Sequence, residues 1–142
     1  MKKLGLLLIA FAFIFITSCK EDEENETPKV KTIVGEWIWV KSYGGISGGD
    51  LQTPENTNSI RKAIFKSDGT MIMTVNGDTT LKSTYSIIRD KSIFDSDSIN
   101  VLVIDKLLTD ISMRYAIMNL TDSLILSEDV CDGYGHMYVR KR

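Results

Sequence analysis

IRKAIFKSDGTMIMTVNGDTTLKSTYSII, residues 60 to 88, contains three runs of apolar and β-branched residues separated by two tight-turn signals. The turns are Asp68-Gly69 and Asn76-Gly77, whose residues tolerate the positive φ angles that a tight hairpin requires. Each run is short, and because side chains alternate along a strand, one face of each run is apolar and the other is mixed. The stretch therefore predicts three consecutive antiparallel strands.

The same pattern of short apolar segments and turns continues on both sides of this stretch. Segments rich in β-branched, aromatic and methionine residues recur at intervals of about 8–12 residues, which is typical of an all-β sandwich or barrel. We expect eight strands, at Trp37–Tyr43, Ile60–Lys66, Thr70–Asn76, Thr80–Ile88, Ile99–Ile104, Ile111–Met118, Ser123–Ser127 and Tyr134–Lys141. Short connections favour pairing between neighbours, and closure would remove exposed edges. We predict an all-β, eight-stranded antiparallel up-and-down barrel, with an open sandwich as the alternative.

Two polar stretches interrupt this pattern. Gly44 to Asn58 contains four glycines and one proline, and loops of this length in compact domains are usually functional or mobile. We expect it to lie over one mouth of the barrel. Asp90 to Ser98 is expected to form another rim.

The N-terminus has the layout of a secretory signal. Lys2 and Lys3 precede an uncharged apolar run from Leu4 to Ile16, which is shorter than the roughly 20 residues of a spanning helix. An uncleaved anchor helix is the alternative. Ile16-Thr17-Ser18-Cys19 resembles the bacterial lipobox. This resemblance implies a signal peptide at 1–18 and lipidation of Cys19, whose acyl chains would hold the protein on a membrane.

An acidic segment follows Cys19. Residues 19–32 contain few groups that could be buried and are expected to form a solvated tether. The run Lys20 to Glu26 resembles the lysine-plus-acidic export tag of surface-displayed lipoproteins in one group of Gram-negative bacteria. It implies an outer-membrane protein, lipid-anchored and exposed on the cell surface. A plain hydrophilic spacer is the alternative.

The composition argues against nucleic-acid binding and against an intrachain disulfide. The chain has 17 Lys and Arg against 19 Asp and Glu, for a net charge of −2. It has no basic stripe, so we expect no binding of nucleic acid. Once Cys19 is lipidated, Cys131 is the one remaining thiol and no intrachain disulfide can form. Residues 33–142 are long enough for one domain with a single modest core.

Several short motifs together resemble the bacterial lipocalin-like domain of the calycin superfamily. They are Val34-Gly35-Glu36-Trp37, the glycine-rich segment after it, Phe65 to Thr70, Ser123 to Ser127 and Tyr138 to Lys141. The resemblance covers about Val34 to Arg142. It implies that Trp37 plugs the closed end of the barrel and that Arg140 lies across its ring, so Gly35, Trp37 and Arg140 are structural. The second and third motifs of larger lipocalins are missing, and retinoid or haem binding is therefore not carried over.

Residues that could support catalysis are scarce. The chain has one histidine, and His136 is separated from Cys131 by the expected Asp132-Gly133 turn. A cysteine–histidine pair would need the two side chains within hydrogen-bond reach. We therefore expect a packed or rim position for His136, and no enzyme activity, metal site or cofactor.

The inward faces of the expected strands are the best candidates for binding. Methionine adapts to irregular surfaces, aromatic rings supply contact area and tyrosine hydroxyls supply polar contacts. The candidate ligand-binding residues are Trp39, Phe65, Met71, Met73, Tyr85, Met113, Tyr115 and Tyr138. They either fill the core or line a cavity, and ligand cavities usually exceed about 300 Å³.

We therefore expect a surface lipoprotein that binds a small, partly apolar ligand in its barrel mouth, under the Gly44–Asn58 loop. The alternative is a protein-interaction or inhibitor module with a filled barrel. The expected partners are the membrane, through the lipid anchor, and a small apolar molecule.

Overall fold

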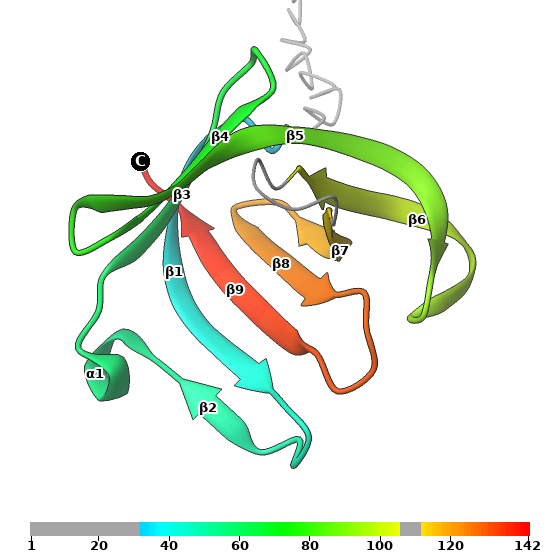
Figure 1. Ribbon diagram of the computed structural model, residues 1–142, viewed down its shortest axis with the longest axis horizontal. Helices are drawn as coiled ribbons and strands as arrows, with labels where there is room; N and C mark the ends of the chain where they lie inside the picture. Colours follow the sequence, from blue (N-terminus) through cyan, green and yellow to red (C-terminus); the bar gives the residue numbers. More distant parts are fainter. Residues whose placement is uncertain (1–31, 106–111) are drawn as a thin grey trace, which may run out of the picture.

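The computed structural model describes residues 32–105 and 112–142, so the predicted signal peptide and Cys19 lie outside the described residues. Nine strands and one short helix occur in these two ranges (Figure 1). The strands are β1 (Gly35–Gly44), β2 (Asp50–Gln52), β3 (Arg61–Phe65), β4 (Thr70–Val75), β5 (Asp78–Ser92), β6 (Asp95–Ile104), β7 (Met113–Leu120), β8 (Ser123–Glu128) and β9 (Tyr134–Arg140), and the helix is α1 (Pro54–Thr57). Within the described ranges, no helix is long and apolar enough to cross a membrane.

Eight of the strands form a closed antiparallel barrel. From β3 to β9 each strand pairs with the next one in the chain, and β1 pairs with β3. β9 also pairs with β1, from Trp37 opposite Arg140 to Gly44 opposite Tyr134. The two strands run side by side in Figure 1. The predicted all-β up-and-down barrel is confirmed, and the open sandwich is wrong because the first and last strands meet.

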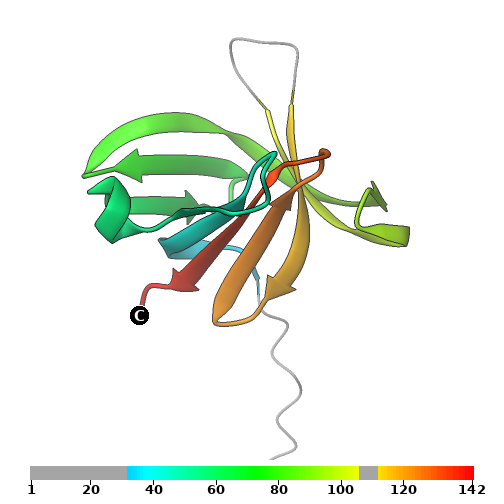
Figure 2. The ribbon, with the colours of Figure 1, turned by 90° about the horizontal axis from the view of Figure 1, so that it is seen from below.

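The two ends of the barrel are distinguished by the strand ends and turns that lie there. Figure 2 shows the C-terminal end of β9 and the β7–β8 turn at one end, and the β8–β9 turn at the other. We call the first the closed end and the second the open end.

The predicted hairpin turns lie where the sequence places them. Asn76 and Gly77 have φ angles of 52° and 94° and connect β4 to β5. The Asn76 side chain accepts a hydrogen bond from the Ile60 amide at 2.8 Å, and its own amide donates to the Ile60 carbonyl. Gly69 has a φ of 81° in the β3–β4 turn. These residues allow tight reversals that bulkier side chains would strain.

Tryptophan plugs the closed end. Trp37 is fully buried, and its indole N–H donates to the Ile33 carbonyl at 2.7 Å. Arg140 lies over the ring, with Cζ 4.2 Å from the centroid. Its Nη1 and Nη2 donate to the carbonyls of Val34 and Thr32, at 2.9 and 2.6 Å. The plug thereby ties the start of the described chain to the last strand.

Gly35 has a steric role beside this plug. Its φ is 141°, and a Cβ atom built there would lie 2.7 Å from Nη1 of Arg140. A side chain at this position would displace the guanidinium. From the plug, the apolar core continues through Phe65, Leu102 and Leu124, which are almost fully buried.

A bulge in β1 changes which side chains face inward. The pairing of β1 with β9 shifts register between Trp39 and Lys41. Such a bulge adds one residue to a strand and re-aims the side chains beyond it. Ser42, at 2% exposure, is therefore buried in the barrel, where strict alternation from Trp39 would place Lys41.

The segment from Gly44 to Asn58 is more structured than predicted. It contains β2, which pairs with the end of β1, and then α1. Thr53 caps α1 by accepting a hydrogen bond from the Asn56 amide, and the Asn56 side chain accepts one from the Thr53 amide in return. The Thr53-Pro54 pair is a helix-start signal that the interpretation as an open loop overlooked.

The segment from Asp90 to Ser98 forms the end of β5, the start of β6 and the hairpin between them. Most of its side chains are exposed, which explains why apolar alternation is missing there. The hairpin tip is fixed by Asp129, whose carboxylate accepts hydrogen bonds from Ser92 Oγ at 2.8 Å and the Ile93 amide at 3.0 Å. Arg114 adds ion pairs to Asp129 and Asp90.

Candidate functional site

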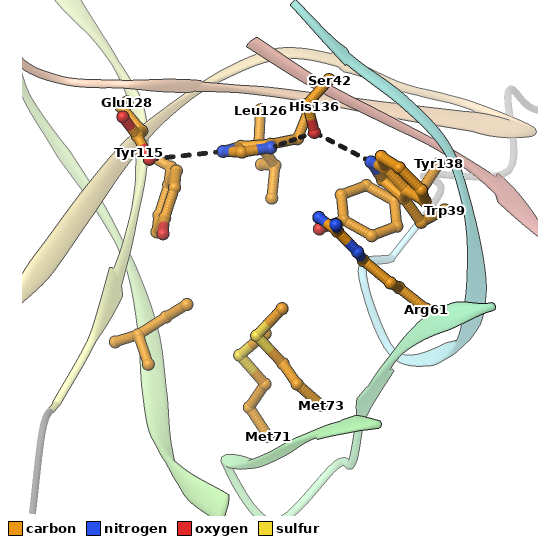
Figure 3. Close-up of a pocket in the computed structure, with 11 residues that line it drawn as sticks. Trp39, Ser42, Arg61, Met71, Met73, Tyr115, Leu126, Glu128, His136 and Tyr138 are labelled. Atoms are coloured by element: carbon orange, nitrogen blue, oxygen red, sulfur yellow. Dashed lines mark hydrogen bonds and ion pairs between the residues drawn. The ribbon is translucent and has the colours of Figure 1, made fainter. Parts of the chain in front are cut away.

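A cavity of about 130 Å³ lies inside the barrel, between Trp39 and Tyr115 (Figure 3). Strands β1, β3, β4, β6, β7, β8 and β9 all contribute to its wall. The lining residues are Trp39, Ser42, Arg61, Met71, Met73, Ile104, Tyr115, Leu126, Glu128, His136 and Tyr138. No residue of the Gly44–Asn58 segment lines this cavity.

Five of the eight predicted ligand-binding residues line this cavity: Trp39, Met71, Met73, Tyr115 and Tyr138. The other three do not line it. Phe65 is buried in the core and packs edge-on against Tyr85, with ring centroids 5.0 Å apart. The Tyr85 hydroxyl donates to the Lys66 carbonyl, and the Met113 sulfur accepts a hydrogen bond from Tyr115.

The polar part of the lining was largely missed by sequence reasoning. Arg61 faces inward because it continues the alternation of Phe65 and Ala63, and Glu128 does so because it continues Leu126. Both signals were present in the strand periodicity, although charged residues do not suggest an inward face. Ser42 had no such signal, since only the bulge turns it inward.

A chain of hydrogen bonds crosses one wall of the cavity. The Trp39 indole N–H donates to Ser42 Oγ at 2.9 Å, and Ser42 Oγ lies 2.8 Å from His136 Nδ1. His136 Nε2 lies 3.4 Å from Glu128 Oε1. Because Ser42 accepts from the indole, its own proton is free to donate to Nδ1, which leaves the histidine proton on Nε2 facing Glu128.

Burial favours the neutral form of this histidine. Desolvation lowers the pKa of His136, and the Glu128 carboxylate opposes part of that shift. Glu128 is itself held, since Oε2 accepts a hydrogen bond from the Tyr134 amide at 2.9 Å. The wall therefore presents a neutral imidazole with a fixed tautomer.

Serine, histidine and glutamate in this order are also the parts of a nucleophilic relay. Here Ser42 is only 2% exposed, and its oxygen already accepts the Trp39 N–H. The geometry orients Trp39 and His136 in the cavity wall. The absence of enzyme activity stays a prediction.

Arg61 forms the most strongly charged part of the lining. Its Cζ lies 4.3 Å from the centroid of the Trp39 ring, within range of a cation–π contact. Nε donates to Ser59 Oγ at 3.1 Å. Ser59 is buried and also shares a hydrogen bond of 2.7 Å with the Thr57 hydroxyl, so the end of α1 helps to position the guanidinium.

Two tyrosines complete the polar contribution. Burial, with a smaller effect from Glu128, raises the pKa of Tyr115 to about 12. Burial likewise raises the pKa of Tyr138 well above its ordinary value. Both phenols are therefore neutral donors at physiological pH. Across residues 32–105 and 112–142, no group of three or more His, Cys, Asp or Glu side chains is placed to hold a metal ion.

Comparisons of this chain with known protein families, with curated proteins and with solved structures find no match. The geometry of the barrel is therefore the basis for any functional conclusion.

Proposed function

We propose that this protein binds one small, partly apolar molecule in the cavity of its barrel. The observation that carries this proposal is a cavity with an apolar floor and several fixed polar groups in its wall. Met71 and Met73 supply the adaptable apolar surface, and Ser42, Arg61 and His136 supply polar contacts. Small-molecule sites usually combine a largely apolar lining with a few placed polar groups.

The cavity volume limits the size of the bound group. At about 130 Å³ it is well below the roughly 300 Å³ at which typical ligand sites begin. An apolar protein cavity of about 150 Å³ holds benzene. We therefore propose a compact ligand, or the compact end of a longer one, about the size of a six-membered ring.

We also propose that the barrel is a lipocalin-like domain carried by a lipoprotein. The plug of Trp37 and Arg140 at the closed end supports the lipocalin-like relationship. The sequence of residues 1–32 supports lipidation at Cys19 and display on the outer membrane, facing outward. Labelling cells with a palmitate analogue tests the first claim, since wild type should incorporate label and Cys19→Ser should not. Protease shaving of intact cells tests the second, and an untouched protein would argue for the periplasmic side.

Ligand binding can be tested by filling the cavity. Met73→Phe should reduce binding of benzyl alcohol, measured by calorimetry, at least tenfold, because the larger ring takes up the free volume. Ile72→Phe is the matched control, since it adds the same ring on the opposite face of β4 and should leave binding unchanged. Equal affinities in wild type and Met73→Phe, with both proteins folded by circular dichroism, would defeat the proposal.

A protein-interaction module is the second candidate, because apolar side chains gather at the loop tips. Ile93 and Val130 are each 55% exposed and Phe94 is 45% exposed. The Ile93 amide is bonded to Asp129, next to Val130, so the two tips lie together. If this module is correct, Ile93→Ser with Phe94→Ser should abolish binding of a purified partner, while Met73→Phe should not.

A further inference from the structure

The proposed ligand site contains one cation with unused hydrogen-bond donors. Arg61 Nε donates a hydrogen bond to Ser59 Oγ. Among the described residues, none accepts a hydrogen bond from its Nη1 or Nη2, and no carboxylate lies within ion-pair distance of it. The guanidinium is nevertheless held in place by Ser59 and the Trp39 ring. A fixed guanidinium with both terminal nitrogens available is well suited to a planar pair of anionic oxygens.

A second donor is available in the same wall. Tyr138 is only 6% exposed, and its hydroxyl has no hydrogen-bond partner in the described part of the chain. Figure 3 shows the Tyr138 and Arg61 side chains on the same side of the cavity. No fully buried side-chain oxygen of the described residues lacks a partner, so this hydroxyl retains some exposure, and a ligand in the cavity can accept its hydrogen bond in place of water.

Glu128, the acidic residue of the lining, is positioned away from Arg61 and Tyr138. Glu128 lies across the cavity from Arg61 in Figure 3, and its two oxygens face the Tyr134 amide and His136 Nε2. An anion near Arg61 would therefore meet donors, with the one lining carboxylate on the far side. That carboxylate disfavours ligands with more than one negative charge.

We infer that the bound molecule is a small monocarboxylate, with its carboxylate on Arg61 and Tyr138 and a compact apolar body against Met71 and Met73. This inference rests on the proposed function and names the class of ligand. It requires no covalent step. The carboxylate supplies two acceptors for the guanidinium, and the apolar body accounts for the methionine surface opposite Trp39.

Isothermal titration calorimetry with two ligands of similar shape tests the inference. Benzoate carries the carboxylate, and benzyl alcohol replaces it with a neutral hydroxyl. The wild-type chain should bind benzoate at least tenfold more tightly than benzyl alcohol. Arg61→Gln should weaken benzoate binding at least tenfold and change benzyl alcohol binding less than about threefold, because charge-assisted hydrogen bonds are the stronger ones.

Lys62→Gln is the matched control. Lys62 is the next residue of β3, carries the same charge, and points outward to an ion pair with Glu36 at 3.0 Å. Its removal should leave both affinities unchanged, and an equal loss of benzoate binding in the two variants would mean that only overall charge matters. Acetate should bind more weakly than benzoate, because it lacks the apolar body.

The outcomes separate this inference from the function on which it rests. Equal affinity of wild type for benzoate and benzyl alcohol overturns the carboxylate assignment and leaves the binding function standing. Failure of both ligands to bind overturns both. If Arg61→Gln does not fold, Arg61→Lys serves in its place and should lose part of the preference for benzoate, because one ammonium cannot replace the guanidinium fork.

Discussion

Two arginine–tryptophan pairs share β1, which carries both tryptophans, while the arginines come from the neighbouring strands β9 and β3, and the stacking distances are nearly equal. Arg140 Cζ is 4.2 Å from the Trp37 centroid, and Arg61 Cζ is 4.3 Å from that of Trp39. The pairs differ in their remaining donors. Arg140 donates from both terminal nitrogens to backbone carbonyls, whereas within residues 32–105 and 112–142 Arg61 donates only from Nε, to Ser59. A stacked arginine is therefore structural or ligand-directed according to where its other hydrogen bonds go.

The largest difference in stability between the two pairs should appear when the tryptophans are replaced. Trp37→Ala should cost about 3–5 kcal/mol of unfolding free energy, as expected for removing a fully buried large aromatic residue. Trp39→Ala should cost less, because one side of its ring borders a cavity and has fewer packing contacts to lose. Urea unfolding of both variants measures the two losses of unfolding free energy. Equal losses would contradict the claim that the barrel is packed around Trp37 and hollow beside Trp39.

A smaller difference is expected between the arginines. Arg140→Gln should destabilise the fold by about 2 kcal/mol, because it removes a cation–π contact and two charge-assisted hydrogen bonds to carbonyls. Arg61→Gln should cost less than about 1 kcal/mol, since it loses one hydrogen bond and a partly exposed stack. The same unfolding assay applies. A larger loss for Arg61 would indicate that its main role is structural.

The smallest effect concerns the pH dependence of stability that comes from His136. Burial lowers the pKa of His136 below its unfolded value, so the unfolded chain takes up a proton first as pH falls. The corresponding stability is complete above the unfolded pKa of about 6.5 and is lost progressively as pH falls below it. Urea midpoints at pH 7.5 and 5.5 should therefore drop more in wild type than in His136→Gln. Equal drops would show that this imidazole is not protected by the fold.

Most of the barrel was predictable from local signals. Turns such as Asn76-Gly77 fixed the strand boundaries, and the β-branched and aromatic runs fixed strand type. The strands inside the polar segments were not predicted. β2 and the hairpin around Asp95 carry exposed side chains on both faces, so they lack the apolar alternation that identifies a strand.

The candidate site was predictable only in its apolar part. Trp39, Met71 and Met73 follow from alternation along their strands. Arg61 follows from the same alternation, but an inward charge makes sense only once the barrel is known to be hollow there. Ser42 depends on the β1 bulge, which is a matter of pairing with β9 and has no signature in the strand itself.

The most direct test of a ligand site at the open end is a benzoate titration followed by the indole N–H resonances of the two tryptophans. Trp39 borders the cavity and Trp37 plugs the far end, so each reports on one region. Progressive, saturable shifts of the Trp39 resonance with a stationary Trp37 resonance are the expected result. A Trp39 resonance that does not move at saturating benzoate would contradict a binding site in the barrel.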